Sequence, residues 1–287
     1  MTPKASRRWR GCRCAAPPAS TTSSTRSRSP RGPAIRPAPA ARPGLLLVGH
    51  GAPRLPEAQA AVEAQALALR RGGAFEAVAC AFLSMPPSPA EALAALRGDP
   101  VCIVPLFMSD GYFVRVALGR ALAADGARDG RHVCQAKPIG LMPGLTEVIE
   151  QRALRACAEA GLVPGRCGLL LVAHGFTGSA ASREAAGFHA GTLAETGRFR
   201  WIDTAFLEEE PMLPDRLAAQ AGDMVVVGLF AAPGGHAAGD VPAALAADPY
   251  RGERRTLYTG AIGADPAVAG VIGAAAAAAL ETGGGAA

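Results

Sequence analysis

The chain has 287 residues and a formal net charge of +5, and its length allows one large domain or two of ordinary size. The charge is uneven: residues 1–43 contain ten basic residues and no acidic one, which leaves 19 basic against 24 acidic residues in 44–287. An acidic body excludes a broad basic surface for nucleic acid. The longest apolar run, 267–280, is too short to cross a membrane, so we expect neither nucleic acid nor membrane as a partner.

Residues 1–43 are rich in Arg and Ser and contain no apolar segment typical of a secretory signal. We expect a disordered basic tail. A transit peptide has a similar composition, and a start codon assigned too early would explain the segment equally well. The seven cysteines are scattered and form no C-x-x-C motif, which is typical of reduced thiols in a cytoplasmic protein.

The remainder of the chain is an internal repeat. Residues 45–51 read LLLVGHG and residues 169–175 read LLLVAHG, an offset of 124. Later matches, such as Leu-Phe at 106–107 and 229–230, keep an offset of 123. Self-similarity at one spacing indicates two copies of a single unit. We therefore expect an N-terminal domain at 44–164 and a C-terminal domain at 165–287.

Each copy alternates short apolar runs with segments of helical composition. In the first copy, Ser88 and Glu91 form a capping-box pattern with Pro89 at the first helical position. The predicted strands are 45–49, 77–83, 101–107, 132–138, 169–173, 201–207, 225–230 and 255–260. The predicted helices are 57–71, 89–96, 114–124, 145–160, 183–195, 214–221, 241–247 and 266–280. Strict alternation predicts an α/β fold with two tandem parallel-sheet βαβ domains facing a central cleft.

Three polar side chains follow three successive strands of the second copy. His174 follows the first strand, Glu208 the second and His236 the third. Because the carboxyl ends of parallel strands meet at one edge of a sheet, we expect these side chains to converge. Two imidazoles and a carboxylate suit Co²⁺, Fe²⁺ or Ni²⁺ and also suit proton removal near neutral pH. His50, which matches His174 in the repeat, is a candidate fourth ligand.

The first copy lacks most of this polar set. In the repeat alignment, three residues without ligand character replace the ionisable ones: Ser84 faces Glu208, Phe113 faces His236 and Ala117 faces Asp240. One complete set and one depleted set predict a single shared site in the cleft. We expect Glu209 and Glu210 to be solvated, and His132 and His189 to have structural roles only.

The strand-His-Gly start of both copies, Phe-Leu-Glu at 206–208 and Gly-Gly-His-x3-Asp-x-Pro at 234–242 resemble the CbiX-type sirohydrochlorin chelatases. The resemblance covers nearly all of 44–287. It implies insertion of Co²⁺ or Fe²⁺ into the tetrapyrrole sirohydrochlorin during cobalamin or siroheme synthesis, with the metal as a substrate and no organic cofactor. It implies that His174, Glu208 and His236 bind the metal and assist pyrrole deprotonation. A fused two-copy chain can form the cleft alone, so a monomer would suffice.

A substrate with several carboxylates would favour arginines at the rim of the cleft. The candidates are Arg54, Arg115 and Arg120, which follow strand ends of the first copy. Arginines that merely face solvent on a helix would give the same sequence pattern. Two other functions stay open. The depleted copy is compatible with a non-catalytic tetrapyrrole or metal carrier. Residues 174–179, HGFTGS, resemble the oxyanion segment of an α/β-hydrolase esterase, but the chain has no G-x-S-x-G elbow.

Overall fold

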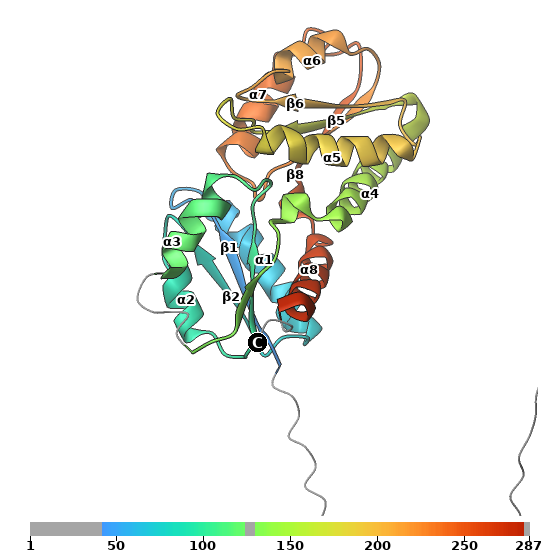
Figure 1. Ribbon diagram of the computed structural model, residues 1–287. Coiled ribbons are helices and arrows are strands. Elements are labelled where there is room, and N and C mark those ends of the chain that lie inside the picture. Colours follow the sequence, from blue (N-terminus) through green and yellow to red (C-terminus); the bar gives the residue numbers. More distant parts are fainter. Residues whose placement is uncertain (1–41, 124–129, 284–287) are drawn as a thin grey trace, which may run out of the picture. The chain divides into compact units, whose positions relative to one another are not determined.

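The computed structural model describes residues 42–123 and 130–283, and the chain in these ranges forms two four-stranded parallel sheets (Figure 1). The first sheet has the order β2-β1-β3-β4 and the second the order β6-β5-β7-β8. The strands of the first sheet are β1 (Gly44–Gly49), β2 (Ala77–Phe82), β3 (Val101–Pro105) and β4 (Val133–Gln135). Those of the second are β5 (Gly168–Ala173), β6 (Trp201–Phe206), β7 (Met224–Gly228) and β8 (Thr256–Ala261). The predicted α/β fold is confirmed.

The helices follow the predicted order with shifts of a few residues at their ends. They are α1 (Pro56–Gly72), α2 (Pro89–Ala95), α3 (Leu118–Ala123), α4 (Pro143–Glu159), α5 (Ala181–Glu195), α6 (Leu213–Ala219), α7 (Val241–Ala246) and α8 (Val268–Gly283). The capping box at α2 is present: the Ser88 hydroxyl accepts from the Glu91 amide, and the Glu91 carboxylate accepts from the Ser88 amide. These bonds satisfy amides that the first helical turn leaves free.

The two central strands that lead into the histidines are completely buried. All six residues of β1 and all six of β5 lie in the interior, as expected for strands covered on both faces. His50 and His174 each follow directly on such a strand. Their backbone positions are therefore set by the fully buried central strand of each sheet.

A π-helical turn precedes the helix after the third strand in both copies. Sequence analysis predicts helices that begin at residues 114 and 241, whereas the structure has the π turn η1 (Phe113–Ala117) before α3 and the π turn η5 (Gly235–Asp240) before α7. Single π turns inside helices are rare and are frequent at functional sites. Both turns lie at the carboxyl edge of their sheet, so Phe113 and His236 occupy equivalent places.

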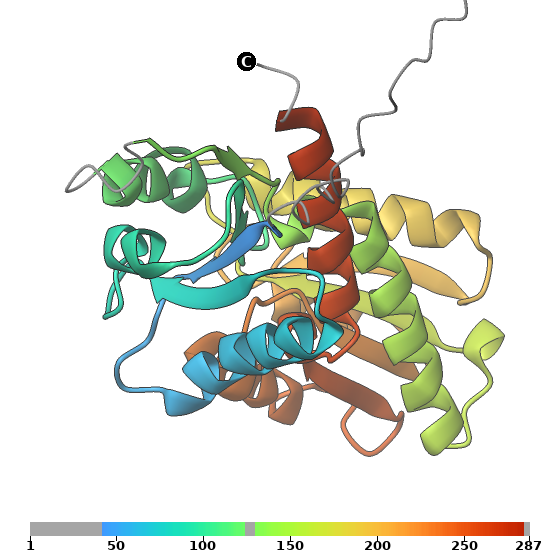
Figure 2. The same ribbon diagram turned by 90° about the horizontal axis from the view of Figure 1, so that it is seen from below.

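The last helix of each copy packs on the sheet of the other copy. Helix α4, from the first copy, contacts β7, β8 and α5, whereas α8, from the second copy, contacts β3, β4 and α1. Figure 2 shows α8 beside α1 and α4. The exchanged helices explain why the described residues of both copies belong to one compact unit.

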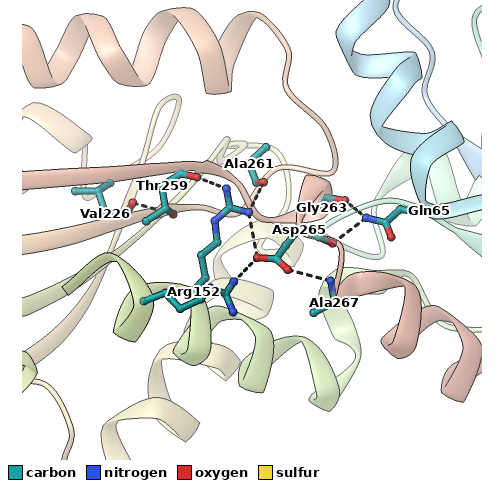
Figure 3. Close-up of polar contacts among 9 residues, drawn as sticks. Gln65, Arg152, Val226, Thr259, Ala261, Gly263, Asp265 and Ala267 are labelled. Atoms are coloured by element: carbon teal, nitrogen blue, oxygen red, sulfur yellow. Dashed lines mark hydrogen bonds and ion pairs between the residues drawn. The ribbon is translucent and has the colours of Figure 1, made fainter. Parts of the chain in front are cut away.

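Buried hydrogen bonds cross between the copies where these helices begin. The Gln65 amide in α1 donates to the carbonyls of Gly263 (3.0 Å) and Asp265 (2.9 Å) (Figure 3). His189 in α5, at the matching repeat position, bonds through Nε2 to the Gly140 carbonyl (2.9 Å). His189 is thus a buried residue with a structural bond, whereas a purely structural role stays a prediction.

Ion pairs accompany the hydrogen bonds that Gln65 makes between the copies. The buried Asp265 carboxylate pairs with Arg152 of α4 at 3.5 Å (Figure 3). It also pairs with Arg155 of the same helix at 2.8 Å. Removing one partner of a buried ion pair leaves an uncompensated charge, so this network fixes the start of α8 against α4. The two copies are thus joined by buried polar contacts as well as by the exchanged helices.

The predicted tail lies outside the described residues except for its last two positions. The Arg42 guanidinium bonds to the Glu76 carboxylate (3.1 Å), and the Pro43 carbonyl accepts from the Glu76 amide (2.8 Å). These two residues are therefore attached to the first sheet. In 42–123 and 130–283, no helix is long and apolar enough to cross a membrane.

The cysteines within the described residues are free thiols. Cys102, Cys157 and Cys167 are buried, and burial raises the pKa of Cys157 to about 11. A thiol with a raised pKa carries little nucleophilic thiolate, so Cys157 acts as a small core residue. Cys12 and Cys14 lie outside the described ranges.

Candidate functional site

His174, Glu208 and His236 lie together at the carboxyl edge of the second sheet. Nε2 of His174 is 3.4 Å from a carboxylate oxygen of Glu208. The rings of His174 and His236 meet edge to face, with centroids 4.4 Å apart and planes at 79°. The structure thus brings together the three residues that sequence analysis selects, with His174 between the other two.

Hydrogen bonds determine which imidazole nitrogens are available. Nδ1 of His174 lies 2.7 Å from the Gly175 carbonyl, and Nδ1 of His236 lies 2.7 Å from the Asp240 carboxylate. Both oxygens only accept, so each Nδ1 carries the hydrogen and each Nε2 is left to bind another group. Nε2 of His174 faces the Glu208 carboxylate, and a cation between the two, either a proton or a metal ion, would satisfy both.

The three side chains do not form a finished metal shell. In the parts of the chain that the structure describes, no cluster of three or more His, Cys, Asp or Glu is arranged to hold a metal ion. The contacts are pairwise, His174 with Glu208 and His174 with His236, and all three side chains are about half exposed. Two imidazole rings and one carboxylate therefore lie side by side without forming a complete coordination shell.

Glu209 is buried, with 4% of its surface exposed, so the expectation that it is solvated is wrong. One carboxylate oxygen lies 3.6 Å from the Arg183 guanidinium, and the other has no hydrogen-bond partner. Its side chain packs against Gly175, where an added Cβ would lie 2.8 Å from the Glu209 Cγ. Gly175 has a φ of +79°, a left-handed conformation that glycine adopts without strain. The buried charge therefore lies directly behind the turn that carries His174.

The repeat contains a signal for this charge that sequence analysis missed. At the same offset of 124, Glu209 faces Met85 and Arg183 faces Gln59. In the first copy Met85 takes this place beside the equivalent glycine, Gly51, where an added Cβ would lie 2.7 Å from the Met85 Cγ. The buried pair thus occurs only in the copy that carries His236 and Glu208. Glu210 is exposed, as expected.

In the first copy His50 has an aromatic neighbour in place of a ligand. Its ring meets Phe113 edge to face, with centroids 4.7 Å apart and planes at 64°. The Ser84 hydroxyl donates to the carbonyls of His50 and Gly51, both at 2.8 Å, so it braces the turn. His50 remains a proposed fourth ligand that could reach a metal only from across the cleft.

Two pockets meet at His174. One, of about 530 Å³, is lined by His50, His174 and His236 together with apolar side chains of both copies. The other, of about 600 Å³, is lined by segments 108–113 and 174–182. His174 belongs to both linings, and both volumes lie in the usual range for small-molecule sites.

The three candidate arginines line neither pocket. Arg54, Arg115 and Arg120 are exposed, and Arg115 pairs with the Asp110 carboxylate at 3.0 Å. Their contact with a substrate stays a prediction.

Several known proteins are similar to this chain in sequence and in fold. The CbiX family matches residues 44–156 and 168–279. A probable sirohydrochlorin cobaltochelatase of Halobacterium salinarum is 31% identical over 221 residues, which cover 69% of this chain and 75% of that protein.

One similar solved structure is CbiX, described as the terminal enzyme of siroheme biosynthesis in denitrifying bacteria. It is 30% identical to this chain, with a TM-score of 0.65. The match covers 83% of this chain and 99% of the CbiX chain. A multi-domain Deinococcus radiodurans protein with structural similarity to chelatases is 28% identical with a TM-score of 0.71. That match covers 82% of this chain but only 54% of the Deinococcus protein, which has two additional domains. With both copies matched and the architecture shared, this chain belongs to the CbiX family.

Proposed function

We propose that this chain inserts a divalent metal ion, Co²⁺ or Fe²⁺, into sirohydrochlorin. The observation that carries the proposal is the placement of His174, with Nε2 facing Glu208 and the ring against His236, where two pockets meet. The Halobacterium relative is named a probable cobaltochelatase, and the CbiX structure is described as an enzyme of siroheme synthesis. The metal and the tetrapyrrole are both substrates, and no organic cofactor takes part.

The geometry suits the holding of a metal ion before transfer. The Nε2 atoms of His174 and His236 are the free donors, and the Glu208 carboxylate offsets part of the charge of a dication. Asp240 holds His236 in the required tautomer. Two nitrogen ligands and one oxygen ligand would leave coordination positions open, through which the ion can pass to the macrocycle nitrogens.

The same groups can take up the protons that insertion releases. Two pyrrole N–H bonds break as two metal–nitrogen bonds form, and the two protons need acceptors. Once the ion leaves, the Nε2 atoms of His174 and His236 are free to accept them. Imidazole has the right basicity for proton uptake near neutral pH.

Metal insertion by the full chain tests the proposal. Sirohydrochlorin and Co²⁺ or Fe²⁺ are mixed with the protein without oxygen, and the change in macrocycle absorbance is compared with the spontaneous rate. We expect His174→Ala and His236→Ala to lower the rate about 100-fold. His132→Ala is the matched control, because His132 is also an exposed histidine bonded to an aspartate, Asp99, and it should retain the wild-type rate.

Each other outcome has a defined meaning. Equal rates for His236→Ala and His132→Ala would contradict the site. Tight macrocycle binding without acceleration by Co²⁺, Fe²⁺ or Ni²⁺ would favour the carrier over the enzyme. The esterase alternative has no support in the fold, because the chain forms two chelatase-like sheets and contains no G-x-S-x-G.

A further inference from the structure

Four rings form a contiguous aromatic cluster at the edge of the first sheet. Phe113 meets His50 at 4.7 Å, Tyr112 at 5.7 Å and Phe107 at 6.0 Å between centroids. Tyr112 is 61% exposed and Phe113 is 44% exposed, so the outer part of the cluster is not used to pack the core. Exposed apolar groups gathered at a pocket mark binding sites more often than surface elsewhere.

The position of Phe113 limits what this cluster can do. Phe113 stands where the second copy has His236, and both residues meet the preceding histidine edge to face. A phenyl ring has no lone pair, so it can neither bind a metal nor accept a proton. It can offer an apolar π face. The first copy thus keeps the ring geometry of the second while losing its metal chemistry.

The pocket beside this cluster has a composition that suits the apolar face of a flat conjugated ring. The pocket of about 600 Å³ is lined on the first copy by Tyr112 and Phe113, and on the second copy by segment 174–182, which includes His174 and Phe176. No Asp, Glu, Lys or Arg occurs among its lining residues. A flat ligand between the two segments would have the aromatic rings on one side and His174 on the other.

We propose that Tyr112 and Phe113, supported by His50, form a platform on which one face of the macrocycle stacks while its other face is turned toward His174. The identity of the macrocycle rests on the proposed function. The two copies then divide the reaction: the second copy handles the metal, and the first copy holds the conjugated ring system. Phe113 is a binding residue in this scheme and not a vestige of a lost ligand.

Macrocycle binding without metal tests the platform apart from catalysis. Metal-free sirohydrochlorin is titrated with the full chain, and the dissociation constant is taken from the change in macrocycle absorbance. Because aromatic stacking adds to simple burial of area, we expect Phe113→Leu to weaken binding about tenfold. Phe113→Trp, which keeps an aromatic face, should stay close to the wild-type affinity.

Phe188→Leu is the matched control. Phe188 is 43% exposed and its ring also lies beside a histidine, His189, but it lines neither pocket. We expect it to bind the macrocycle like the wild type. Cobalt affinity, measured without macrocycle, should be unchanged in Phe113→Leu, because this residue donates nothing to the metal.

The results that would overturn the platform differ from those that would overturn the chelatase. If the wild-type chain binds the macrocycle but inserts no metal, the proposed function fails, and the platform is still decided by Phe113→Leu. Equal macrocycle affinities of Phe113→Leu and Phe188→Leu would overturn the platform even in an active chelatase. So would self-association of the chain that Phe113→Leu abolishes without weakening macrocycle binding, because the cluster would then be a dimer contact.

Discussion

The two copies have the same backbone arrangement at the carboxyl edge of their sheets but carry different side chains there. In both, a fully buried central strand ends in a His-Gly pair, and a π turn after the third strand sets a second ring against the histidine. The ring pairs differ by only 0.3 Å in centroid distance, 4.4 Å for His174 with His236 and 4.7 Å for His50 with Phe113. The backbone therefore fixes where the rings meet, and single side chains decide whether the pair can bind a metal.

The two copies differ in charged side chains as well as in the imidazole of His236. The second copy has ionisable side chains at positions where the first has neutral ones: Glu208 against Ser84, Glu209 against Met85, Arg183 against Gln59 and Asp240 against Ala117. Burying a carboxylate such as Glu209 is costly, so its presence in one copy only is not explained by the shared fold. The proposed function accounts for the difference, because it requires metal handling by the second copy alone.

Moving the polar set into the first copy should have the largest effect. The triple variant Ser84→Glu, Phe113→His, Ala117→Asp supplies the missing carboxylate, imidazole and orienting aspartate beside His50. We expect the number of Co²⁺ ions bound per chain to rise from one to two, measured by equilibrium dialysis. The variant Ser84→Gln, Phe113→Leu, Ala117→Asn changes the same positions without adding metal ligands and should bind one. A natively folded triple variant that still binds one ion would show that the edge geometry alone does not make the site.

Removing the orienting carboxylate from the second copy should have a smaller effect. Asp240 accepts from Nδ1 of His236 at 2.7 Å, and partners of this kind typically change metal affinity 10- to 100-fold. We expect Asp240→Asn to weaken Co²⁺ binding about tenfold, measured by calorimetry. Asp99→Asn removes the matching carboxylate from His132, away from the cleft, and should leave Co²⁺ binding unchanged. Equal affinities of the two variants would mean that Asp240 does not orient a metal ligand.

The architecture of this molecule can be predicted from the sequence because the signals for it are local and occur in both copies. The apolar runs at 45–49 and 169–173, the capping box at Ser88 and the offset of 124 each predict what the structure has. The exchange of α4 and α8 leaves no such signal, since an apolar helix face has the same period whichever sheet it covers. The π turns span only five and six residues, too few for their period to differ visibly from that of an α-helix.

Burial of a single charge is harder still to predict. Glu209 stands in a run of three glutamates, and nothing local distinguishes it from its exposed neighbours, Glu208 and Glu210. Its burial depends on the turn at Gly175 and on Arg183 in α5, both distant in sequence. Only the comparison with Met85 and Gln59 points to it.

The smallest expected effect concerns the hydrogen bonds that Gln65 and His189 make between the copies. Only the bond from His189 should contribute a pH-dependent free energy of unfolding. Gln65 and His189 occupy the same repeat position, but only His189 titrates, and burial lowers its pKa below the usual 6.5. Its partners, the Thr146 hydroxyl and the Gly140 carbonyl, are uncharged. The folded state therefore holds His189 neutral, whereas the unfolded chain takes up a proton below about pH 6.5. Stability is then full above that pH and falls as the pH drops toward the lowered pKa.

The variant His189→Gln places the residue of the first copy in the second and removes this titration. We expect the free energy of unfolding by urea to fall less between pH 7.5 and pH 5.5 in the variant than in the wild type. At pH 7.5 the variant should itself be somewhat less stable, because glutamine cannot reproduce both the bond to Gly140 and the bond to Thr146. Parallel losses in the two proteins over this range would show that His189 is not the titrating group.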